Sequence, residues 1–271
     1  MPYRVVIGNN KGGSGKTATT VNLAAALAEA SHRVLVVDMD PQANASRRLG
    51  RPFDPAEPVA TTAEVVKAGA DQEGVAAAAV VACGWDGTYA EHIDLIPSRF
   101  DLENRVSEAG VLGAVGRLYT ALSGVDDDYD VTLIDCPPSL GHLTQLGMAA
   151  ATHALCTVEP EFDGVDGAVR FRDFIAKHGP SLRQPGAAAE LRMAGFVVTR
   201  VRSQMTAHSY QIEGLPDLFG DLLWSPQIPE RAAIKDAADI PTSLRTLGTG
   251  PAREMAAVFA ELAKQLLAVQ R

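Results

Sequence analysis

The stretch NNKGGSGKT at residues 9–17 decides the fold of this chain, because it connects an expected strand at 4–7 to an expected helix at 17–30. Glycines in such a loop let backbone N–H groups converge on an anion at the N-terminus of the helix, where the helix dipole also favours negative charge. Lys16 can then reach the β- and γ-phosphates of a nucleotide, and the hydroxyl of Thr17 can bind Mg²⁺. The stretch therefore predicts a phosphate-binding loop.

The loop carries one lysine more than most phosphate loops. The common pattern G-x-x-x-x-G-K-[ST] requires glycine at position 10, where this chain has Asn10. The chain instead reads K-G-G-x-G-K-T, which adds Lys11 to the lysine that already serves the phosphates. This extra lysine predicts a nucleotide site that uses a second cation.

A second interpretation of the same residues is a dinucleotide-binding turn. Residues 13–18 also fit the pattern G-x-G-x-x-G/A, and Asp38 follows about twenty residues later, as in hydride-transfer enzymes. The loop from Gly8 to Lys16 is long for such a turn, and Lys16 and Thr17 would have no task on a pyrophosphate bound by backbone donors. We therefore favour the phosphate loop.

Composition bounds the class of protein. The chain has 271 residues, of which 46% are hydrophobic, and it shows no linker or repeat, so we expect one domain over 1–271. A net charge of −9 argues against a surface dominated by nucleic-acid binding but leaves room for a local basic patch. The longest apolar stretch, 75–83, is too short to span a bilayer, and a strand at residue 4 leaves no room for a signal peptide. With three widely spaced cysteines, we expect a cytoplasmic protein.

Apolar runs of strand length alternate with helical patterns, which predicts an α/β fold: a mostly parallel twisted sheet with helices on both faces, as in P-loop ATPases. Strands are expected at 4–7, 33–38, 93–97, 131–135, 154–158 and 194–199, and helices at 17–30, 165–177, 205–219 and 252–269. The segment 52–94 is interpreted as a partly helical excursion, and the acidic run 126–130 as a solvated loop.

The last expected helix carries an apolar stripe, formed by Met255, Val258, Phe259, Leu262, Leu266 and Val269. Such a stripe can lie on a membrane or pack in a core. Because its opposite face carries Glu254 and Glu261 and few basic residues, we favour core packing.

Acidic residues end several of the apolar strands. Asp38, Asp135 and Glu159 stand at the carboxyl ends, where ligands bind in such sheets. A buried acid needs a partner, and we expect a phosphate-bound Mg²⁺ to supply it. Asp135 fits an acid that holds Mg²⁺ through its water shell, and Asp40, in the loop beyond Asp38, fits a residue that orients or deprotonates the attacking water. Cys136 is interpreted as a small buried residue.

Three motifs occur in order along the chain: K-G-G-x-G-K-T at 11–17, D-x-D-P-Q at 38–42 and D-C-P-P at 135–138. In this combination they resemble the ParA/Soj/MinD family of deviant Walker-A ATPases, and within it the ParA-type chromosome and plasmid partition ATPases. Further similarity at 95–98, 158–162 and 226–231 extends the resemblance over essentially the whole chain.

The resemblance implies an Mg²⁺-dependent ATPase that forms an ATP-sandwich homodimer and hydrolyses ATP slowly. Lys11 would cross to the partner's nucleotide, Lys16 would serve the phosphates and Asp40 would activate water. The metal would be held by Thr17, Asp38 and Asp135. The nucleotide would be bound by Lys11, Gly12, Gly13, Ser14, Gly15, Lys16, Thr17, Ala18, Arg200 and Pro229.

The resemblance also implies partners. The dimer would bind DNA without sequence preference, through Arg200, Arg202, Arg231 and Lys235, and would act with a centromere-binding, ParB-type protein on the nucleoid. No stable membrane binding is expected. Two departures from the family pattern stand out: Ala18 replaces a threonine whose side chain would contact the α-phosphate, and Ala233 replaces a DNA-contacting basic residue. No helix-turn-helix domain precedes the ATPase, so operator binding is not expected.

Three rival functions share this fold. A MinD-like, membrane-associated positioning ATPase is weakened by the absence of a basic amphipathic tail. An iron–sulphur reductase component needs paired cysteines facing a dimer axis, which Cys83, Cys136 and Cys156 do not offer at their spacing. A metabolic ligase or synthetase remains open on motifs alone.

Overall fold

A seven-stranded sheet forms the centre of the computed structural model, which describes residues 2–67, 72–187 and 190–270. The strands are β1 Arg4–Gly8, β2 Val34–Asp38, β3 Val81–Ala82, β4 Ile93–Ile96, β5 Val131–Asp135, β6 His153–Val158 and β7 Arg192–Val198. Their order is β3-β4-β2-β5-β1-β6-β7, and every neighbouring pair is parallel except β3 with β4. The central strands are buried along their whole length, as expected of strands covered on both faces.

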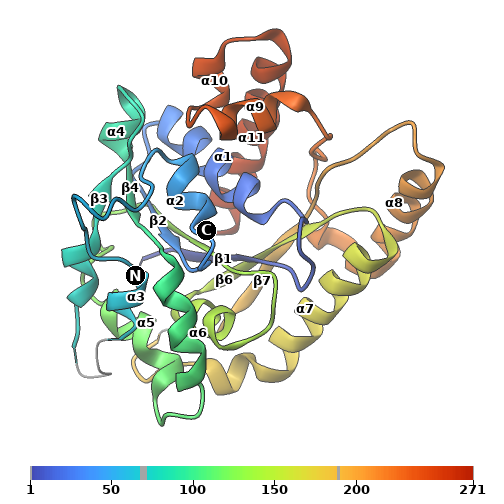
Figure 1. The fold of residues 1–271 in the computed structure, drawn as a ribbon. Coiled ribbons are helices and arrows are strands. Elements are labelled where there is room, and N and C mark those ends of the chain that lie inside the picture. The colour runs from blue at the N-terminus through green and yellow to red at the C-terminus, as the bar shows by residue number, and fades with distance from the viewer. Residues whose placement is uncertain (1, 68–71, 188–189, 271) are drawn as a thin grey trace.

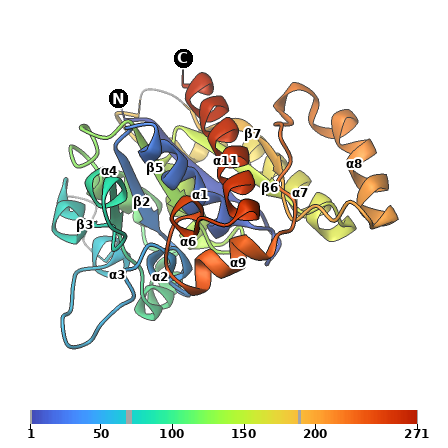
Figure 2. The same cartoon turned by 90° about the horizontal axis from the view of Figure 1, so that it is seen from above.

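Helices cover both faces of the sheet, so the predicted α/β fold is confirmed (Figure 1). The α-helices are α1 Lys16–Glu29, α2 Asn44–Arg48, α3 Thr62–Val65, α4 Thr88–His92, α5 Arg117–Ala121, α6 His142–Ala150, α7 Phe162–Leu182, α8 Thr206–Phe219, α9 Ala232–Asp239, α10 Leu244–Leu247 and α11 Gly250–Val269. The 3₁₀ turns are η1 Val75–Ala79, η2 Phe100–Glu108, η3 Ala114–Gly116 and η4 Gly220–Leu222. One buried cluster joins the sheet to α1, α9 and α11, and the other joins it to α6 and α7 (Figure 2).

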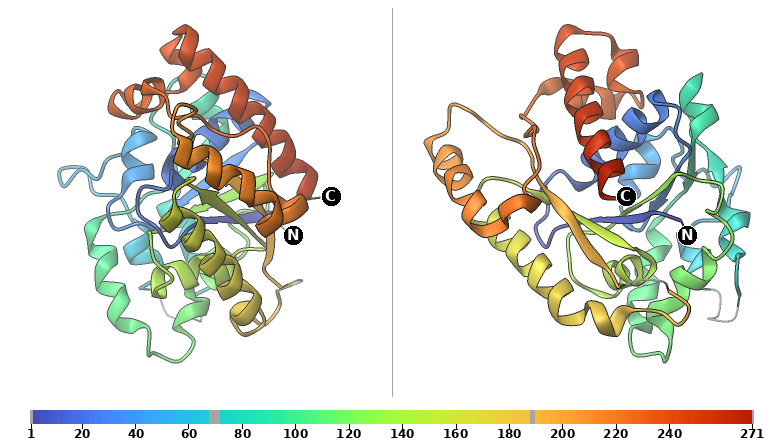
Figure 3. Two further views of the ribbon diagram at one scale, coloured as in Figure 1. Left: turned by 90° about the vertical axis from the view of Figure 1, so that its right-hand side faces the viewer. Right: turned by 180° about the vertical axis from the view of Figure 1, so that it is seen from behind.

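The C-terminal helix α11 packs on α1 and closes the first of these cores (Figures 1 and 3). Phe259, Leu262 and Leu266 are fully buried, and the hydroxyl of Tyr3 donates to the carbonyl of Leu266 at 3.0 Å. The interpretation of the stripe as core packing is therefore confirmed. Within the described ranges, no helix is long and apolar enough to cross a membrane.

The segment 52–94 contains α3, η1, β3 and α4, so its partly helical character is confirmed for the residues that the structure describes; 68–71 lie outside them. The sequence did not predict β3, which adds an antiparallel strand at the edge beside β4. With only two residues inside an alanine-rich run, β3 has no pattern of its own.

The acidic run 126–130 is only partly a solvated loop. Asp127, Asp128 and Asp130 are exposed, as expected, but Asp126 is fully buried. The Nε and Nη2 atoms of Arg4 each donate to its carboxylate at 2.7 Å, and the hydroxyl of Thr132 donates at 2.8 Å. The interpretation was wrong for Asp126, because its partner lies 122 residues away in the chain and no local pattern marks the pair.

Replacing Asp126 with alanine is expected to lower the free energy of unfolding by about 3–5 kcal/mol, since it leaves the buried guanidinium of Arg4 without a counter-charge. Urea denaturation of purified protein measures this. Asp128→Ala removes the same charge from the exposed part of the run and is expected to change stability by no more than about 0.5 kcal/mol. Equal losses in the two variants would show that the buried ion pair has no special weight.

Candidate functional site

The loop between β1 and α1 has the backbone that its glycines predict. Gly13 and Gly15 adopt left-handed φ angles of +78° and +83°, which are strained for residues with a side chain. The carbonyl of Gly15 then accepts from the N–H of Thr19 at 2.8 Å, at the start of α1. Two left-handed residues therefore curl the loop around the N-terminus of α1, where an anion is favoured.

Lys16 lies folded across this loop. Its ammonium donates to the carbonyl of Lys11 at 2.9 Å and to the hydroxyl of Ser14 at 3.4 Å. Burial lowers the pKa of Lys16, although the nearby acids Asp135 and Asp40 oppose this effect. A phosphate on the loop would give this buried cation the counter-charge that it lacks.

The acids at the strand ends come together as predicted. Asp38 and Asp135 are partners in the register of β2 and β5, and both are fully buried. Burial raises the pKa of each carboxyl, and for Asp38 the charge of Asp135 adds to the rise. The carboxylate of Asp135 accepts from the hydroxyls of Thr17 at 2.7 Å and Thr20 at 2.9 Å. Thr17 and Asp135 thus offer adjacent oxygen ligands of the hard type that Mg²⁺ prefers, in a place short of positive charge.

Both carboxylate oxygens of Asp38 accept hydrogen bonds from the protein itself. Its Oδ1 accepts from the N–H of Asp40 at 3.1 Å, and its Oδ2 accepts from the N–H and hydroxyl of Ser46 at 2.8 and 2.7 Å. These bonds fix the loop between β2 and α2. Asp40 follows in that loop with one oxygen accepting from the N–H of Gln42 at 2.9 Å, and it lines the cavity described next.

A cavity of about 420 Å³ opens beside the loop. Its polar end is lined by Gly13, Ser14, Gly15, Lys16, Thr17, Ala18, Asp40 and Gln42, and its apolar end by Ile228, Pro229, Ile234 and Phe259. The 228–230 loop is held against the end of β7, because Ile228 donates to the carbonyl of Val198 at 2.8 Å. The structure therefore brings Pro229 and Arg200 into the same cavity as the phosphate loop, as the sequence predicted.

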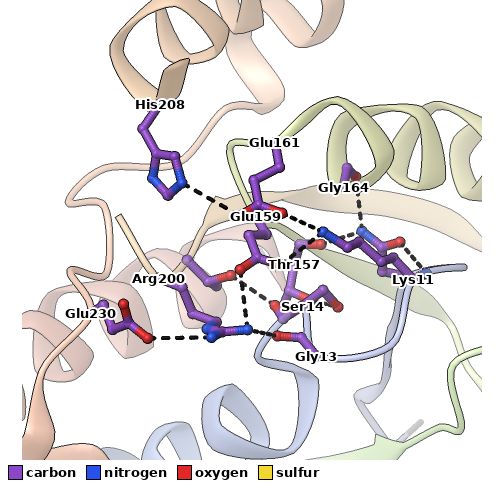
Figure 4. A network of polar contacts seen from close by, with 12 residues as sticks. Lys11, Gly13, Ser14, Thr157, Glu159, Glu161, Gly164, Arg200, His208 and Glu230 are labelled. Atoms are coloured by element: carbon purple, nitrogen blue, oxygen red, sulfur yellow. Dashed lines mark hydrogen bonds and ion pairs between the residues drawn. The ribbon is translucent and has the colours of Figure 1, made fainter. Parts of the chain in front are cut away.

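Lys11 is not among the residues that line this cavity, and its side chain points toward Glu159 and Glu161 (Figure 4). Its ammonium pairs with Glu159 at 3.0 Å and Glu161 at 2.9 Å, and its N–H donates to the side chain of Asn9 at 2.8 Å. Burial alone would lower the pKa of Lys11, but hydrogen bonds with Glu161 and Glu159 outweigh it, and the pKa is raised. Glu159 is thus paired with cations of the protein itself. The prediction that Mg²⁺ is the partner of this strand-end acid was wrong for Glu159.

The same network reaches two further elements (Figure 4). Arg200, held at a left-handed φ of +55°, pairs with Glu159 at 3.1 Å and donates to the carbonyl of Gly13 at 2.9 Å. His208 at the start of α8 is buried, and its Nε2 lies 3.7 Å from Glu161. The loop that holds Lys11 is therefore connected to β7 and α8 by side-chain contacts.

The four basic residues predicted to bind DNA do lie together, but around an acid. Arg200 pairs with Glu230 at 3.3 Å, Lys235 pairs with it at 3.7 Å, and Arg202 forms a close ion pair with it. Arg231 donates to its backbone carbonyl at 3.2 Å. The hydrogen bond from Arg202, together with Arg200, lowers the pKa of Glu230 to about 2. Much of the positive charge of this cluster is balanced within the chain.

Sequence reasoning missed the roles of Glu161, His208 and Glu230. The second acid of the Glu-Pro-Glu motif at 159–161 was a usable signal for Glu161, since two acids at a strand end facing a loop lysine predict an ion pair. His208 and Glu230 carry no such local signal. All three cysteines are buried, as interpreted for Cys136, so none of them reaches the surface to share a cluster across a dimer axis.

Comparison with known proteins identifies the family. The family model described as an AAA domain matches residues 3–184. The chromosome partitioning protein ParA of Myxococcus xanthus is 30% identical over 233 residues, which cover 86% of this chain and 77% of the relative. This chain belongs to the ParA/MinD family of ATPases. The sporulation initiation inhibitor protein Soj of Bacillus subtilis is 29% identical over 265 residues, covering 97% of this chain and 98% of Soj.

Other ParA relatives are longer. A putative replication protein A of Rhizobium rhizogenes is 32% identical over 239 residues, covering 84% of this chain. The chain spans 58% of the length of that relative and of a second replication protein A from Sinorhizobium fredii. The predicted family is confirmed, and the hydride-transfer interpretation is set aside.

Solved structures share the fold. The McdA–ATP complex from Cyanothece has a TM-score of 0.82 at 24% identity, covering 100% of this chain and 98% of McdA. Cobyrinic acid a,c-diamide synthase from Mycobacterium smegmatis, with bound ADP and magnesium, has a TM-score of 0.76 at 28% identity, covering 98% and 94%. The cell division ATPase MinD of Pyrococcus furiosus has a TM-score of 0.73 at 25% identity, covering 99% and 100%. The fold thus serves an ATP-binding protein, a synthetase and a cell division ATPase alike.

Proposed function

We propose that this chain is a partition ATPase that binds Mg²⁺–ATP, dimerises with the nucleotides between the subunits, hydrolyses ATP slowly and moves or positions DNA. The observation that carries the proposal is that the two lysines of the loop lie in different places. Lys16 and Thr17 line the nucleotide cavity and Asp135 accepts from the hydroxyl of Thr17, whereas Lys11 stands outside that lining. A lysine that does not face its own cavity is available to a second subunit.

Within one subunit, the cavity residues would bind and orient the nucleotide. Lys16 and the loop N–H groups would neutralise the terminal phosphates, and the apolar end at Ile228 and Pro229 would take the base. Thr17 and Asp135 would hold Mg²⁺, which neutralises phosphate charge when bound. Asp40 would orient the attacking water, because it lines the cavity at the end where the phosphates lie. We assign Asp38 to anchoring the Asp40 loop, since its oxygens accept from Asp40 and Ser46.

Between subunits, Lys11 would leave Glu159 and Glu161 and reach the nucleotide of the partner. The triphosphate would compete well for the ammonium, since the carboxylate of Glu161 is 40% exposed and buried Glu159 keeps Arg200 as its second partner when Lys11 leaves. ATP would thus stabilise the dimer, and ADP, without the γ-phosphate, would not.

The dimer would bind DNA through the basic cluster around Glu230, and a ParB-type protein would be its partner on the DNA cargo. The ParA and Soj relatives support this role. Two subunits bring two such clusters to one surface, which is how an acidic chain could present a local cationic patch.

The test is ATP-dependent binding of random-sequence duplex DNA. With about four phosphates neutralised, the salt slope is about −3.6, so affinity is expected to fall roughly 150-fold between 50 and 200 mM salt. Replacing Arg202, which does not line the nucleotide cavity, with alanine should weaken binding to all sequences equally and flatten the slope, with ATPase activity retained. No ATP-dependent shift of random DNA at low salt would mean that this ATPase moves on something other than DNA.

Glu230→Gln is the matched control, and it is expected to change DNA affinity in the opposite direction. The carboxylate competes with DNA for Arg200, Arg202 and Lys235, so its removal is expected to strengthen DNA binding by about three- to fivefold, a modest factor because exposed ion pairs are individually weak. Weaker DNA binding in Glu230→Gln would instead show that Glu230 is needed to hold the cluster in shape.

A further inference from the structure

Arg48, the last residue of α2, lines the nucleotide cavity with an unbalanced charge. It shares that lining with Ala18 and Lys16, and it also lines a small adjoining cavity with Asn22 and Ile234. The side chain is half-buried, and across 2–67, 72–187 and 190–270 no group of the chain forms a hydrogen bond or an ion pair with its guanidinium. Burial lowers the pKa of Arg48, and the charge of Asp135 only partly opposes this.

The other basic residues of the cavity lining are all engaged. Lys16 donates to the carbonyl of Lys11, Arg200 and Lys235 pair with Glu230, and Arg231 donates to its carbonyl. Among the described residues, Arg48 is therefore the cation of this cavity whose side chain makes no hydrogen bond or ion pair with the protein. A half-buried guanidinium without a partner is unfavourable unless a bound anion supplies one.

The backbone of α2 is held in place, so Arg48 cannot move away with its helix to find a partner. Both the N–H and the hydroxyl of Ser46 donate hydrogen bonds to Asp38. The same hydroxyl accepts a hydrogen bond from the N–H of Ser98 at 2.9 Å. The indole N–H of Trp85 donates to the carbonyl of Arg48 at 2.9 Å. These contacts preorganise the position, as a binding residue requires.

The neighbours of Arg48 indicate which part of a nucleotide it meets. Lys16 and Asp40 mark the end for the terminal phosphates, and Ile228 marks the apolar end. Arg48 shares the main lining with Ala18 and lines the adjoining cavity together with Ile234. Ala18 directly follows Lys16 and Thr17 at the start of α1, so a nucleotide with its terminal phosphates on Lys16 would have its α-phosphate near Ala18.

We propose that Arg48 binds the α-phosphate of the nucleotide, at the position where Ala18 offers no hydroxyl. A guanidinium matches two phosphate oxygens at once, so it serves this task better than a single hydroxyl. Arg48 is then a positioning residue that holds the nucleotide by a group common to ATP and ADP. The inference rests on the proposed nucleotide binding.

The experiment compares ATP, ADP and adenosine as competitors of a fluorescent ADP analogue, on wild type and Arg48→Ala. We expect affinity for ATP and for ADP to fall by the same factor, about ten- to a hundredfold, and affinity for adenosine to stay unchanged. A loss for ATP alone would assign Arg48 to the γ-phosphate, and an equal loss for adenosine would assign it to the base or to the fold; either result overturns the proposal. Wild type that binds no nucleotide would refute the proposed function instead.

Three further variants test the assignment, and the first two separate binding from folding. Arg47→Ala removes the exposed neighbour on α2, which donates to the side chain of Asn44, and is expected to leave both affinities unchanged. Arg48→Gln keeps the aliphatic stem and is expected to lose ATP and ADP affinity to the same extent with an unchanged melting temperature. Ala18→Thr is expected to restore affinity in Arg48→Ala and to add little to wild type; purely additive effects would show that the two positions do not share a phosphate.

Discussion

Lys11→Ala is expected to bind ATP with near wild-type affinity and to lose hydrolysis by a factor of roughly 10³–10⁵, the range for a cation supplied to phosphoryl transfer by a second subunit. The reason is its position: Lys11 lies outside the lining of its own nucleotide cavity, paired with Glu159 and Glu161. ATP-driven dimerisation, followed by light scattering, should be lost as well. Steady-state phosphate release measures the rate, and equilibrium titration measures the affinity.

The cross-subunit role has its own test. In a mixture of Lys11→Ala with Asp40→Ala, one site of the mixed dimer combines an intact Asp40 with a Lys11 from its partner, so part of the activity should return. No recovery at any mixing ratio would remove the main support for action in trans. Glu161→Gln is the matched control, because it weakens the contact that holds Lys11 in its own subunit and should favour dimerisation at lower ATP concentration.

Asp40→Ala is expected to bind Mg²⁺–ATP normally, to lose hydrolysis by roughly 10²–10⁴, the range for general acid–base catalysis, and to accumulate as a persistent dimer. Asp40 lines the cavity with one carboxylate oxygen bonded to Gln42, and its loop is fixed by Asp38. Size-exclusion chromatography with ATP and Mg²⁺ reports the dimer, and a monomeric Asp40→Ala protein would refute this assignment.

Asp135→Ala should behave differently from Asp40→Ala. Asp135 accepts from the hydroxyls of Thr17 and Thr20, so its loss removes the acid beside the expected metal and should weaken Mg²⁺–ATP binding itself. Titration of ATP with and without Mg²⁺ separates the two roles. If both variants lost affinity alike, Asp40 would belong to the binding of the metal rather than to hydrolysis.

The sequence by itself determined the fold class and the core of the site. The conformation of the loop at 9–17 follows from its own residues, because Gly13 and Gly15 permit left-handed backbone and Lys16 and Thr17 follow at the start of the helix. The apolar runs that end in Asp38 and Asp135 predicted two strands of a parallel sheet, since buried strands are continuous hydrophobic segments and their carboxyl ends share one edge. These features depend on residues close together in the chain, which is why the pattern alone was sufficient.

Only the tertiary structure decided which charges meet. Glu159 pairs with Lys11 across 148 residues, and Asp126 pairs with Arg4 across 122. Nothing local distinguishes buried Asp126 from the exposed acids beside it, so the sequence placed it in solvent, and the strand-end position of Glu159 was interpreted as a metal site. The same holds for Arg48: only the folded structure shows that no acidic side chain of the described residues pairs with its guanidinium. Ion pairs between distant segments follow from the packing of the whole chain, and a local sequence pattern does not show which distant side chains will meet.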